Sequence, residues 1–289
     1  MKEIKIDKLI ISICKDYKLC NLGNEINAIY KREIEHFNAV INGTTNKPFS
    51  PSKLLINCVE LVPFESKSHY KYNYKIMLNN TEWGELYWET YKIPNKYAFI
   101  KLNNKILYNG EWQQYNTIIT ALNLTVSHIS VLDLCCDNTV NLADRYLRII
   151  SNKANEIVVN GKLIKNRNKL INNPYFIVSG SLNNPQCNWS INFTTIDKSL
   201  LFRGYNKALE IIQNSGKNYQ ISTDEEVIYR GEISIGAKQL NRNELNNITV
   251  FELLELLKEN NYRYRLFIKY LMRLFRYGKH NKKRKTLIS

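Results

Sequence analysis

The chain has 289 residues, of which 44% are hydrophobic and 23% are charged, so it can bury a core and its composition excludes a disordered protein. A formal net charge of +15 indicates a polyanionic partner. The six cysteines contain no C-x-x-C pair and the four histidines stand singly, which argues against a structural zinc site. No apolar run approaches the ~20 residues that span a bilayer, so we expect a reduced, cytoplasmic protein with no membrane partner.

The first half of the chain is predicted to contain two short helices, a linker and then a series of strands. Apolar residues at roughly helical spacing predict the helices within residues 3–40, and the Asn-, Gly- and Pro-containing residues 42–51 predict the linker. Beyond residue 54 the apolar period becomes that of a strand, with β-rich segments at 70–78, 84–88, 98–102, 106–107 and 129–137. The Asn pairs at 79–80 and 103–104 are typical of turns, and residues 114–122 form a predicted helix.

The second half repeats strands and ends in helices. Residues 141–152 predict a helix, and strands are expected at 175–178, 190–194, 199–205 and 227–235. A helix beginning near Lys207 is expected to end at the Gly-containing residues 215–217. Residues 250–259 and 262–277 predict a helical pair, followed by a basic tail at 279–285. The fold class is therefore α+β, with a mainly antiparallel sheet, helices packed on it and a basic helical C-terminus.

Two acidic residues are predicted to share one face of the strand at 129–137. Alternation in a strand places Asp133, Cys135 and Asp137 together. Asp137 is equally well explained as a turn residue at the end of the strand. Asp133 lies in mid-strand between leucines, where an unpaired carboxylate would be costly to bury, so a metal ion or an arginine partner is expected.

The later strand at 227–235 carries Arg230, Glu232 and Ser234 on one face by the same alternation. Taken alone, this pattern favours a cross-strand ion pair on a solvated sheet face. Combined with Asp133, however, Glu232 would supply hard oxygen ligands suited to Mg²⁺ or Mn²⁺, with Asp137 or Glu210 assisting.

Tyr205, Lys207 and Glu210 lie between these two acidic strands in the sequence. A tyrosine hydroxyl with an ordinary pKa of about 10 is a poor nucleophile, so it needs a neighbouring cation and a metal-polarised phosphate. Lys207 could provide the cation. With nineteen tyrosines in the chain, Tyr205 is singled out by its neighbours and not by its type.

The C-terminal segment carries most of the excess positive charge, because residues 262–289 contain ten Lys or Arg and no Asp or Glu. Its helix interleaves cations with aromatic residues and could follow a phosphate backbone; an amphipathic core helix with a solvated charged face is equally compatible, and a membrane-surface helix is a lesser alternative. The predicted DNA-binding residues are Arg263, Arg265, Lys269, Arg273, Arg276, Lys282, Lys283, Arg284 and Lys285.

The order of several short motifs resembles the replication initiation factor (Rep_trans) family, and the resemblance covers roughly residues 70–240. The motifs are Asn79-Asn80 to Gly84, residues 107–112 (LYNGEW), residues 132–137 (LDLCCD), residues 204–207 (GYNK) and residues 230–232 (RGE). Filamentous-phage gene II-type initiators and some conjugative relaxases are similar. Members of the family start rolling-circle replication of small plasmids and some phages.

The resemblance implies a Mg²⁺- or Mn²⁺-dependent endonuclease that nicks one DNA strand at an origin, presented as single-stranded or cruciform DNA, with a possible host helicase as partner. Tyr205 would become attached to the 5′-phosphate and leave a free 3′-OH, while Lys207 and Arg230 contact phosphate. Val131 and Asn192 depart from the family pattern, which often has Arg and Tyr there, and Tyr175 is the reserve nucleophile.

The predicted organisation is an N-terminal helical region (1–45), a catalytic α+β domain (53–238) and basic C-terminal helices with a tail (239–289). Two alternatives remain open. One is a noncatalytic origin- or operator-binding protein on the same fold, and the other is a mobilisation relaxase.

Overall fold

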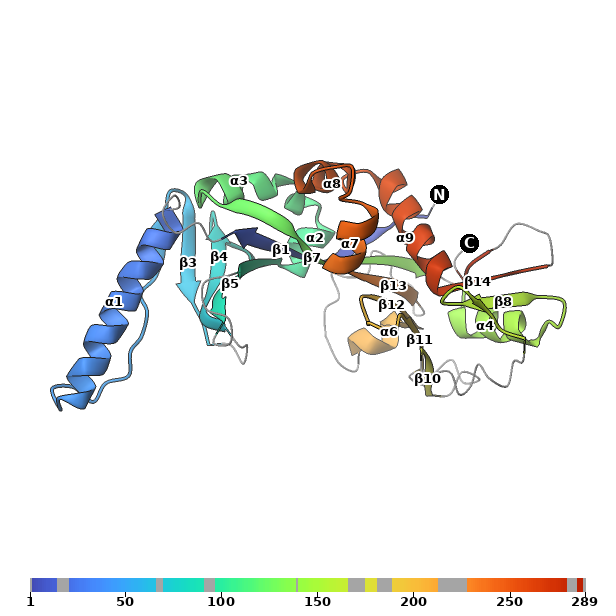
Figure 1. Cartoon of the computed structure of the whole chain (residues 1–289), viewed down its shortest axis with the longest axis horizontal. Helices are drawn as coiled ribbons and strands as arrows, with labels where there is room; N and C mark the ends of the chain where they lie inside the picture. The colour runs from blue at the N-terminus through green and yellow to red at the C-terminus, as the bar shows by residue number, and fades with distance from the viewer. Residues whose placement is uncertain are drawn as a thin grey trace. The chain divides into compact units, whose positions relative to one another are not determined.

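The computed structural model (Figure 1) describes residues 2–14, 21–65, 70–90, 97–138, 140–165, 175–180, 189–212, 228–279 and 285–287. Contacts group the chain into two compact units, one formed by Met1–Leu9 with Val131–Ser289 and the other by Ile10–Ser130. Strands β1 (Lys5–Cys14) and β7 (Thr125–Asn138) contribute residues to both units.

The Ile10–Ser130 unit is built on an antiparallel sheet. Its strand order is β1, β6 (Tyr97–Leu102), β5 (Thr81–Thr90), β4 (Tyr70–Leu78), β3 (Val59–Pro63) and β2 (Leu54–Ile56). In β4 every second side chain from Tyr72 to Leu78 is buried, as expected for a strand with one face on a core. Asn79 and Asn80 both have positive φ, 50° and 61°, which suits the tight turn that joins β4 to β5.

Helices complete this unit. α1 (Asn21–Ile41) buries Leu22, Ile26 and Ile29 in its first half. α2 (Asn104–Tyr108), the short 3-10 helix η1 (Glu111–Gln114) and α3 (Tyr115–Ala121) connect β6 to β7. The amide of Lys105 donates to the side chain of Asn103, which therefore caps α2.

The other unit contains a second antiparallel arrangement, in the order β10 (Phe176–Gly180), β11 (Trp189–Thr194), β12 (Leu200–Asn206), β13 (Tyr229–Gly236) and β7. One face of these strands is apolar, and α4 (Leu142–Ser151) packs against β11 and β12 there, while Phe275 of β14 (Phe275–Gly278) packs against β11. β14 forms a small sheet with β8 (Glu156–Val159) and β9 (Lys162–Leu163). Ring contacts from Tyr146 to Phe176 (5.2 Å) and from Phe193 to Phe275 (4.8 Å) hold these layers together. The opposite face of the strands is polar.

Among the described residues this unit also contains α6 (Lys207–Glu210), α7 (Ala237–Asn243), α8 (Val250–Leu256) and α9 (Asn260–Leu274). Thr249 caps α8, and the side chain of Glu252 reciprocates by accepting from the Thr249 amide, a capping box. α9 contacts β12 and β13 and buries Phe267, Tyr270 and Leu271. No helix among the described residues is both long enough and apolar enough to cross a membrane.

The predicted fold class is confirmed, and most predicted strands and helices exist with limits within a few residues. Three elements are wrong. The first predicted helix within residues 3–40 is instead strand β1, residues 106–107 lie in helix α2, and the last helix stops at Leu274, after which Phe275–Gly278 is a strand. The predicted helix stop at 215–217 lies outside the described residues. The division at 1–45, 53–238 and 239–289 stays a prediction, because compactness does not test whether a segment folds alone.

Candidate active site

The polar face of β7, β13 and β12 consists of three cross-strand rows. Each row runs from β7 through β13 to β12. The rows are Asp133–Ser234–Leu201, Cys135–Glu232–Arg203 and Asp137–Arg230–Tyr205. Because paired residues point to the same side of a sheet, the predicted sharing of one face by the acids of β7 and by Arg230 and Glu232 is confirmed. Tyr205, predicted from its sequence neighbours alone, joins the same face.

Arg230 is a fully buried charged residue of this face. Its side chain is fully buried, and it donates from Nε to Oδ1 of Asp137 (2.6 Å), from Nη2 to Oδ2 of Asp137 (2.8 Å) and from Nη1 to Oδ1 of Asp7 (3.2 Å). A guanidinium held in this way is a structural ion pair with fork geometry. The predicted phosphate contact by Arg230 is therefore not supported, since the side chain has no exposed surface. Asp137, a predicted metal ligand, has both carboxylate oxygens engaged by Arg230.

Asp133 is a buried carboxylate with incomplete partners. It is 7% exposed, and its Oδ1 has no hydrogen-bond partner among the described residues. Burial raises the pKa of Asp133 to about 6, and the negative charge of Glu232 adds to the rise while a hydrogen bond with Ser234 opposes it. No arginine pairs with Asp133 among the residues that the structure describes, and a cation would satisfy the carboxylate.

Glu232 is hydrogen-bonded to Tyr205 and lies close enough to Asp133 to raise its pKa. It is 9% exposed, and the Tyr205 hydroxyl donates to its Oε2 at 3.1 Å. Burial raises the pKa of Glu232, and the nearby charge of Asp7 raises it further, while Arg203 lowers it. Asp7, Asp133 and Glu232 thus concentrate negative charge beside the tyrosine hydroxyl.

Tyr205 is half-buried and lies between two cations. The Arg203 guanidinium carbon is 6.0 Å from the centre of its ring and the Lys207 ammonium is 5.9 Å from it. Burial raises the pKa of Tyr205, and the charge of Glu232 raises it further, against a smaller lowering by Arg230. The hydroxyl is therefore held in place but is not activated by these residues alone.

Lys207 and Glu210 form a pair of their own at the start of α6. The Lys207 ammonium donates to Oε2 of Glu210 at 2.6 Å, and Lys207 is buried. The amide of Leu209 donates to the side chain of Asn206, which fixes the turn from β12 into α6. Glu210 is therefore placed beside Lys207, and its predicted role as a metal ligand stays a prediction.

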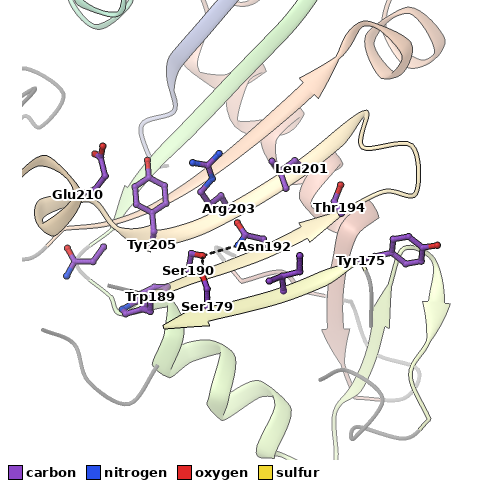
Figure 2. Close-up of a pocket in the computed structure, with 12 residues that line it drawn as sticks. Tyr175, Ser179, Trp189, Ser190, Asn192, Thr194, Leu201, Arg203, Tyr205 and Glu210 are labelled. Carbon is purple, nitrogen blue, oxygen red and sulfur yellow. Dashed lines mark hydrogen bonds between the residues drawn. The ribbon is translucent and has the colours of Figure 1, made fainter. Parts of the chain in front are cut away.

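A pocket of about 780 Å³ covers the polar face of β10, β11 and β12. Figure 2 shows Tyr205, Arg203 and Glu210 on the same side of the ribbon, with Tyr175 at the far end of the strands. Hydroxyl and amide groups lie between them. The side-chain amide of Asn192 donates to the hydroxyl of Ser190 (3.0 Å), and the hydroxyls of Ser190 and Ser179 are 2.6 Å apart. The volume is in the range of sites that take a small ligand or part of a polymer.

The two candidate tyrosines are separate within this pocket. Tyr205 pairs with Ser190, whereas the carbonyl of Tyr175 accepts from the amide of Thr194, four positions farther along β11. At about 3.3 Å per residue this is about 13 Å along the strand. Since the buried carboxylates lie beside Tyr205, the pocket favours Tyr205 over Tyr175.

The predicted metal ligands do not form a ready cluster. No three His, Cys, Asp or Glu side chains converge as a ligand set within the described ranges. Asp133 and Glu232 nevertheless fit a divalent cation, because their pKa values are raised by burial and Oδ1 of Asp133 is unpartnered. Magnesium sites commonly use one or two carboxylates and complete the shell with water and substrate phosphate.

The predicted DNA-binding residues of the C-terminus divide into two kinds. Arg263 donates to the carbonyls of Ile4, Leu257 and Lys258, so its guanidinium serves the structure. Arg265, Lys269 and Arg273 are exposed, and their spacing of four places them in one stripe along α9; Lys269 pairs with Glu244 at 2.6 Å.

The remaining members of that group lie beyond α9. Arg276 is half-buried in β14, and Lys285 is exposed and pairs through its backbone with Tyr277. Lys282, Lys283 and Arg284 lie outside the described residues.

Two site residues were missed from the sequence. Asp7 was assigned to a helix. The sequence Ile4-Lys5-Ile6-Asp7 alternates apolar and polar residues, which is a signal of a strand, and the structure buries Ile4 and Ile6 more than Lys5 and Asp7. Arg203 precedes Tyr205 by two positions in a strand, so period-two alternation would have placed both on one face.

The comparisons with known proteins leave the family open. No protein-family model matches the chain, and no curated protein sequence matches it either. A solved structure of a rolling circle replication initiator protein from Geobacillus stearothermophilus is similar over 98% of this chain and 90% of that one, with 10% identity and a TM-score of 0.46. A likeness of this size supports no argument about fold or function. The relation to the replication initiation factor family therefore stays a resemblance of motifs.

Proposed function

We propose that the protein is a rolling-circle replication initiator that nicks one DNA strand through Tyr205. The observation that carries the proposal is the hydrogen bond from the Tyr205 hydroxyl to Glu232 (3.1 Å) at the wall of an open pocket, beside the buried and incompletely partnered Asp133. Nucleophile, proton acceptor and acidic ligands are thereby within one group of side chains, as phosphodiester transfer to tyrosine requires.

In the proposed reaction, the Tyr205 oxygen forms a bond to the phosphorus and its proton passes to Glu232. The bond between the phosphorus and the 3′ oxygen breaks, and that oxygen takes up a proton from water to become the free 3′-OH. The 5′-phosphate remains esterified to Tyr205. The Tyr205 hydroxyl already donates to Oε2 of Glu232, so this carboxylate is placed to accept the proton.

Asp133 and Glu232 would hold a Mg²⁺ or Mn²⁺ ion, which would polarise the phosphate when bound. The charges of the chain itself favour a metal ion beside these two carboxylates. The pKa values of Asp133, Glu232 and Tyr205 are all raised, and a cation beside them would relieve all three at once. Arg203 is exposed beside Tyr205, and we assign it the phosphate contact that Arg230 is too buried to make.

Single-stranded DNA is the proposed substrate. The pocket combines hydroxyl and amide groups with the exposed Arg203 and the rings of Tyr175 and Tyr205, and a surface with a cation and aromatic rings suits an unpaired nucleotide. The exposed cations of α9 would contact the phosphate backbone of the origin. A host helicase as a partner is part of the same proposal.

The experiment is covalent capture. The protein is incubated with single-stranded DNA from its own replicon, with Mn²⁺ or with EDTA, and run on a denaturing gel as wild type, Tyr205→Phe and Tyr175→Phe. We expect a Mn²⁺-dependent protein–DNA adduct that Tyr205→Phe loses and Tyr175→Phe keeps. The Tyr175 variant is a matched control because both tyrosines line the same pocket.

Other outcomes select among the alternatives. An adduct that survives Tyr205→Phe moves the nucleophile to another tyrosine and contradicts the proposal. Tight binding to DNA without any adduct favours the noncatalytic origin- or operator-binding protein. A mobilisation relaxase would give the same adduct and differs in whether the nicked site belongs to a replication or a transfer origin.

A further inference from the structure

A row of chemically different side chains crosses the strands from the acidic group into the pocket. The row runs from β13 to β10 and consists of Glu232, Arg203, Asn192 and Ile177. Paired residues point to the same side of a sheet and neighbouring strands lie about 4.8 Å apart, so the row spans about 14 Å. The Tyr205 hydroxyl donates to Glu232. The proposed nucleophile therefore stands at the acidic end of this row.

The side-chain amide of Asn192 has a fixed orientation. Its Nδ2 donates to Oγ of Ser190 (3.0 Å), and the Ser190 hydroxyl is in turn paired with that of Ser179 (2.6 Å), as Figure 2 shows. These hydrogen bonds turn the amide nitrogen toward Ser190. No group among the described residues donates to Oδ1 of Asn192. This acceptor and the second N–H of the amide are therefore left for a ligand.

The place of Asn192 distinguishes it from an ordinary polar residue on a solvated sheet. Asn192 is half-buried and lines the pocket of about 780 Å³. It stands between the exposed guanidinium of Arg203 on one neighbouring strand and the 57% exposed Ile177 on the other. A cation, an amide and an alkyl group thus follow one another along the floor of one cavity.

This order of groups is complementary to a nucleotide. Arg203 is already assigned the phosphate contact, and the next two side chains of the row would face the base, the amide at its edge and Ile177 at its face. An amide offers an acceptor beside a donor. Adenine offers the amino group at N6 beside the acceptor N7, so the two form a pair of hydrogen bonds. On the same edge guanine and thymine offer only acceptors, and cytosine only a donor.

We propose that Asn192 is a specificity-determining residue that recognises an adenine in the nucleotide whose phosphate Arg203 contacts. Oδ1 of Asn192 accepts from N6 of the base and Nδ2 donates to N7. Ser190 and Ser179 are positioning residues, because their hydroxyls hold the amide in the required orientation. The inference deepens the proposed function and rests on single-stranded DNA as the ligand. It does not depend on which tyrosine is the nucleophile.

The test uses short oligothymidines with a single A, C or G in place of one central thymine, beside the unsubstituted oligothymidine. Binding to the full chain is measured by fluorescence anisotropy in EDTA, and adduct formation is measured with Mn²⁺. The wild type should bind the adenine oligonucleotide about tenfold more tightly than the others. Unsubstituted purine in place of adenine lacks the N6 amino group and should lose this advantage.

Two variants of Asn192 and one control separate recognition from stability. Asn192→Leu should bind all four oligonucleotides equally. Asn192→Asp should transfer the preference to cytosine, because a carboxylate accepts from N4 of cytosine and has no donor for N7 of adenine. Thr194→Val is the matched control on the same strand and pocket wall, since the Thr194 hydroxyl already donates to the carbonyl of Leu200 (3.2 Å). It should keep the adenine preference.

Equal binding of the four oligonucleotides by the wild type would overturn the proposal, and so would an adenine preference that Asn192→Leu retains. Each preference is a ratio measured on one variant, so a change of stability alone does not produce it. Adducts with Mn²⁺ that show no base preference would remove the adenine site and leave the nicking activity. An adenine preference in EDTA that depends on Asn192, without any adduct, would confirm the site and remove the nicking activity.

Discussion

Replacing Asp133 by asparagine should stabilise the metal-free protein while removing its response to Mn²⁺. The pKa of Asp133 in the folded protein is about 6, above the ordinary 3.8, because the carboxylate is buried. The ionised form is therefore the costly one, and the cost appears as the pH rises from about 3.8 and is complete above about 6. At about 1.4 kcal/mol per pKa unit, the difference corresponds to about 3 kcal/mol.

The assay is urea unfolding of wild type and Asp133→Asn in EDTA, near pH 8 and near pH 4. We expect the variant to be more stable by about 3 kcal/mol at the higher pH and equal to wild type at the lower pH. Adding Mn²⁺ should stabilise the wild type, by about 2.7 kcal/mol at a hundred times the dissociation constant, and leave the variant unchanged.

A control of opposite sign is Asp197, whose carboxylate is exposed and whose pKa is lowered by hydrogen bonds from Lys238, Ser199 and Thr195. Asp197→Asn should destabilise the protein at neutral pH and lose this effect in acid, since the ionised form is the favoured one there. Equal stability of wild type and Asp133→Asn near pH 8 would refute the reasoning about the buried carboxylate.

The remaining predictions concern the cations. Arg230→Leu should destabilise the fold by about 3–5 kcal/mol in chemical unfolding, because it leaves the acidic partners of Arg230 uncompensated, and an effect below about 1 kcal/mol would disprove the structural role. Arg203→Ala should leave stability within about 0.5 kcal/mol but slow adduct formation by about a hundredfold, and an unchanged rate would remove it from the site. Alanine at Arg265, Lys269 and Arg273 together should lower the slope of log affinity for duplex DNA against log salt by about 2 to 3, and an unchanged slope would exclude this stripe from DNA binding.

Local patterns were sufficient to predict the central strands and their polar face. Alternation in β7 and β13 depends only on the geometry of a strand, so Asp133, Asp137, Arg230 and Glu232 could be assigned to faces before their partners were known. Residues 141–152 were likewise assigned to a helix, which α4 confirms, because helix signals are local.

Pairing between distant segments could not be predicted in the same way. Residues 5–14 contain isoleucines whose spacing also fits a helix, and antiparallel pairing with β6 makes them a strand. That error concealed Asp7, and with it the reason why Arg230 is a buried ion-pair residue. Asp137 pairs with Arg230, and Oδ1 of Asp133 has no hydrogen-bond partner among the described residues. Both facts depend on which strands are neighbours, and no local pattern contains that information.

The most direct test of the central claim is identification of the DNA-linked peptide. The adduct formed with Mn²⁺ is digested with a nuclease and a protease, and the peptide that retains a nucleotide phosphate is sequenced by mass spectrometry. We expect the phosphate on Tyr205, in the peptide that begins after Arg203. A phosphate on Tyr175 or on any other residue would contradict it.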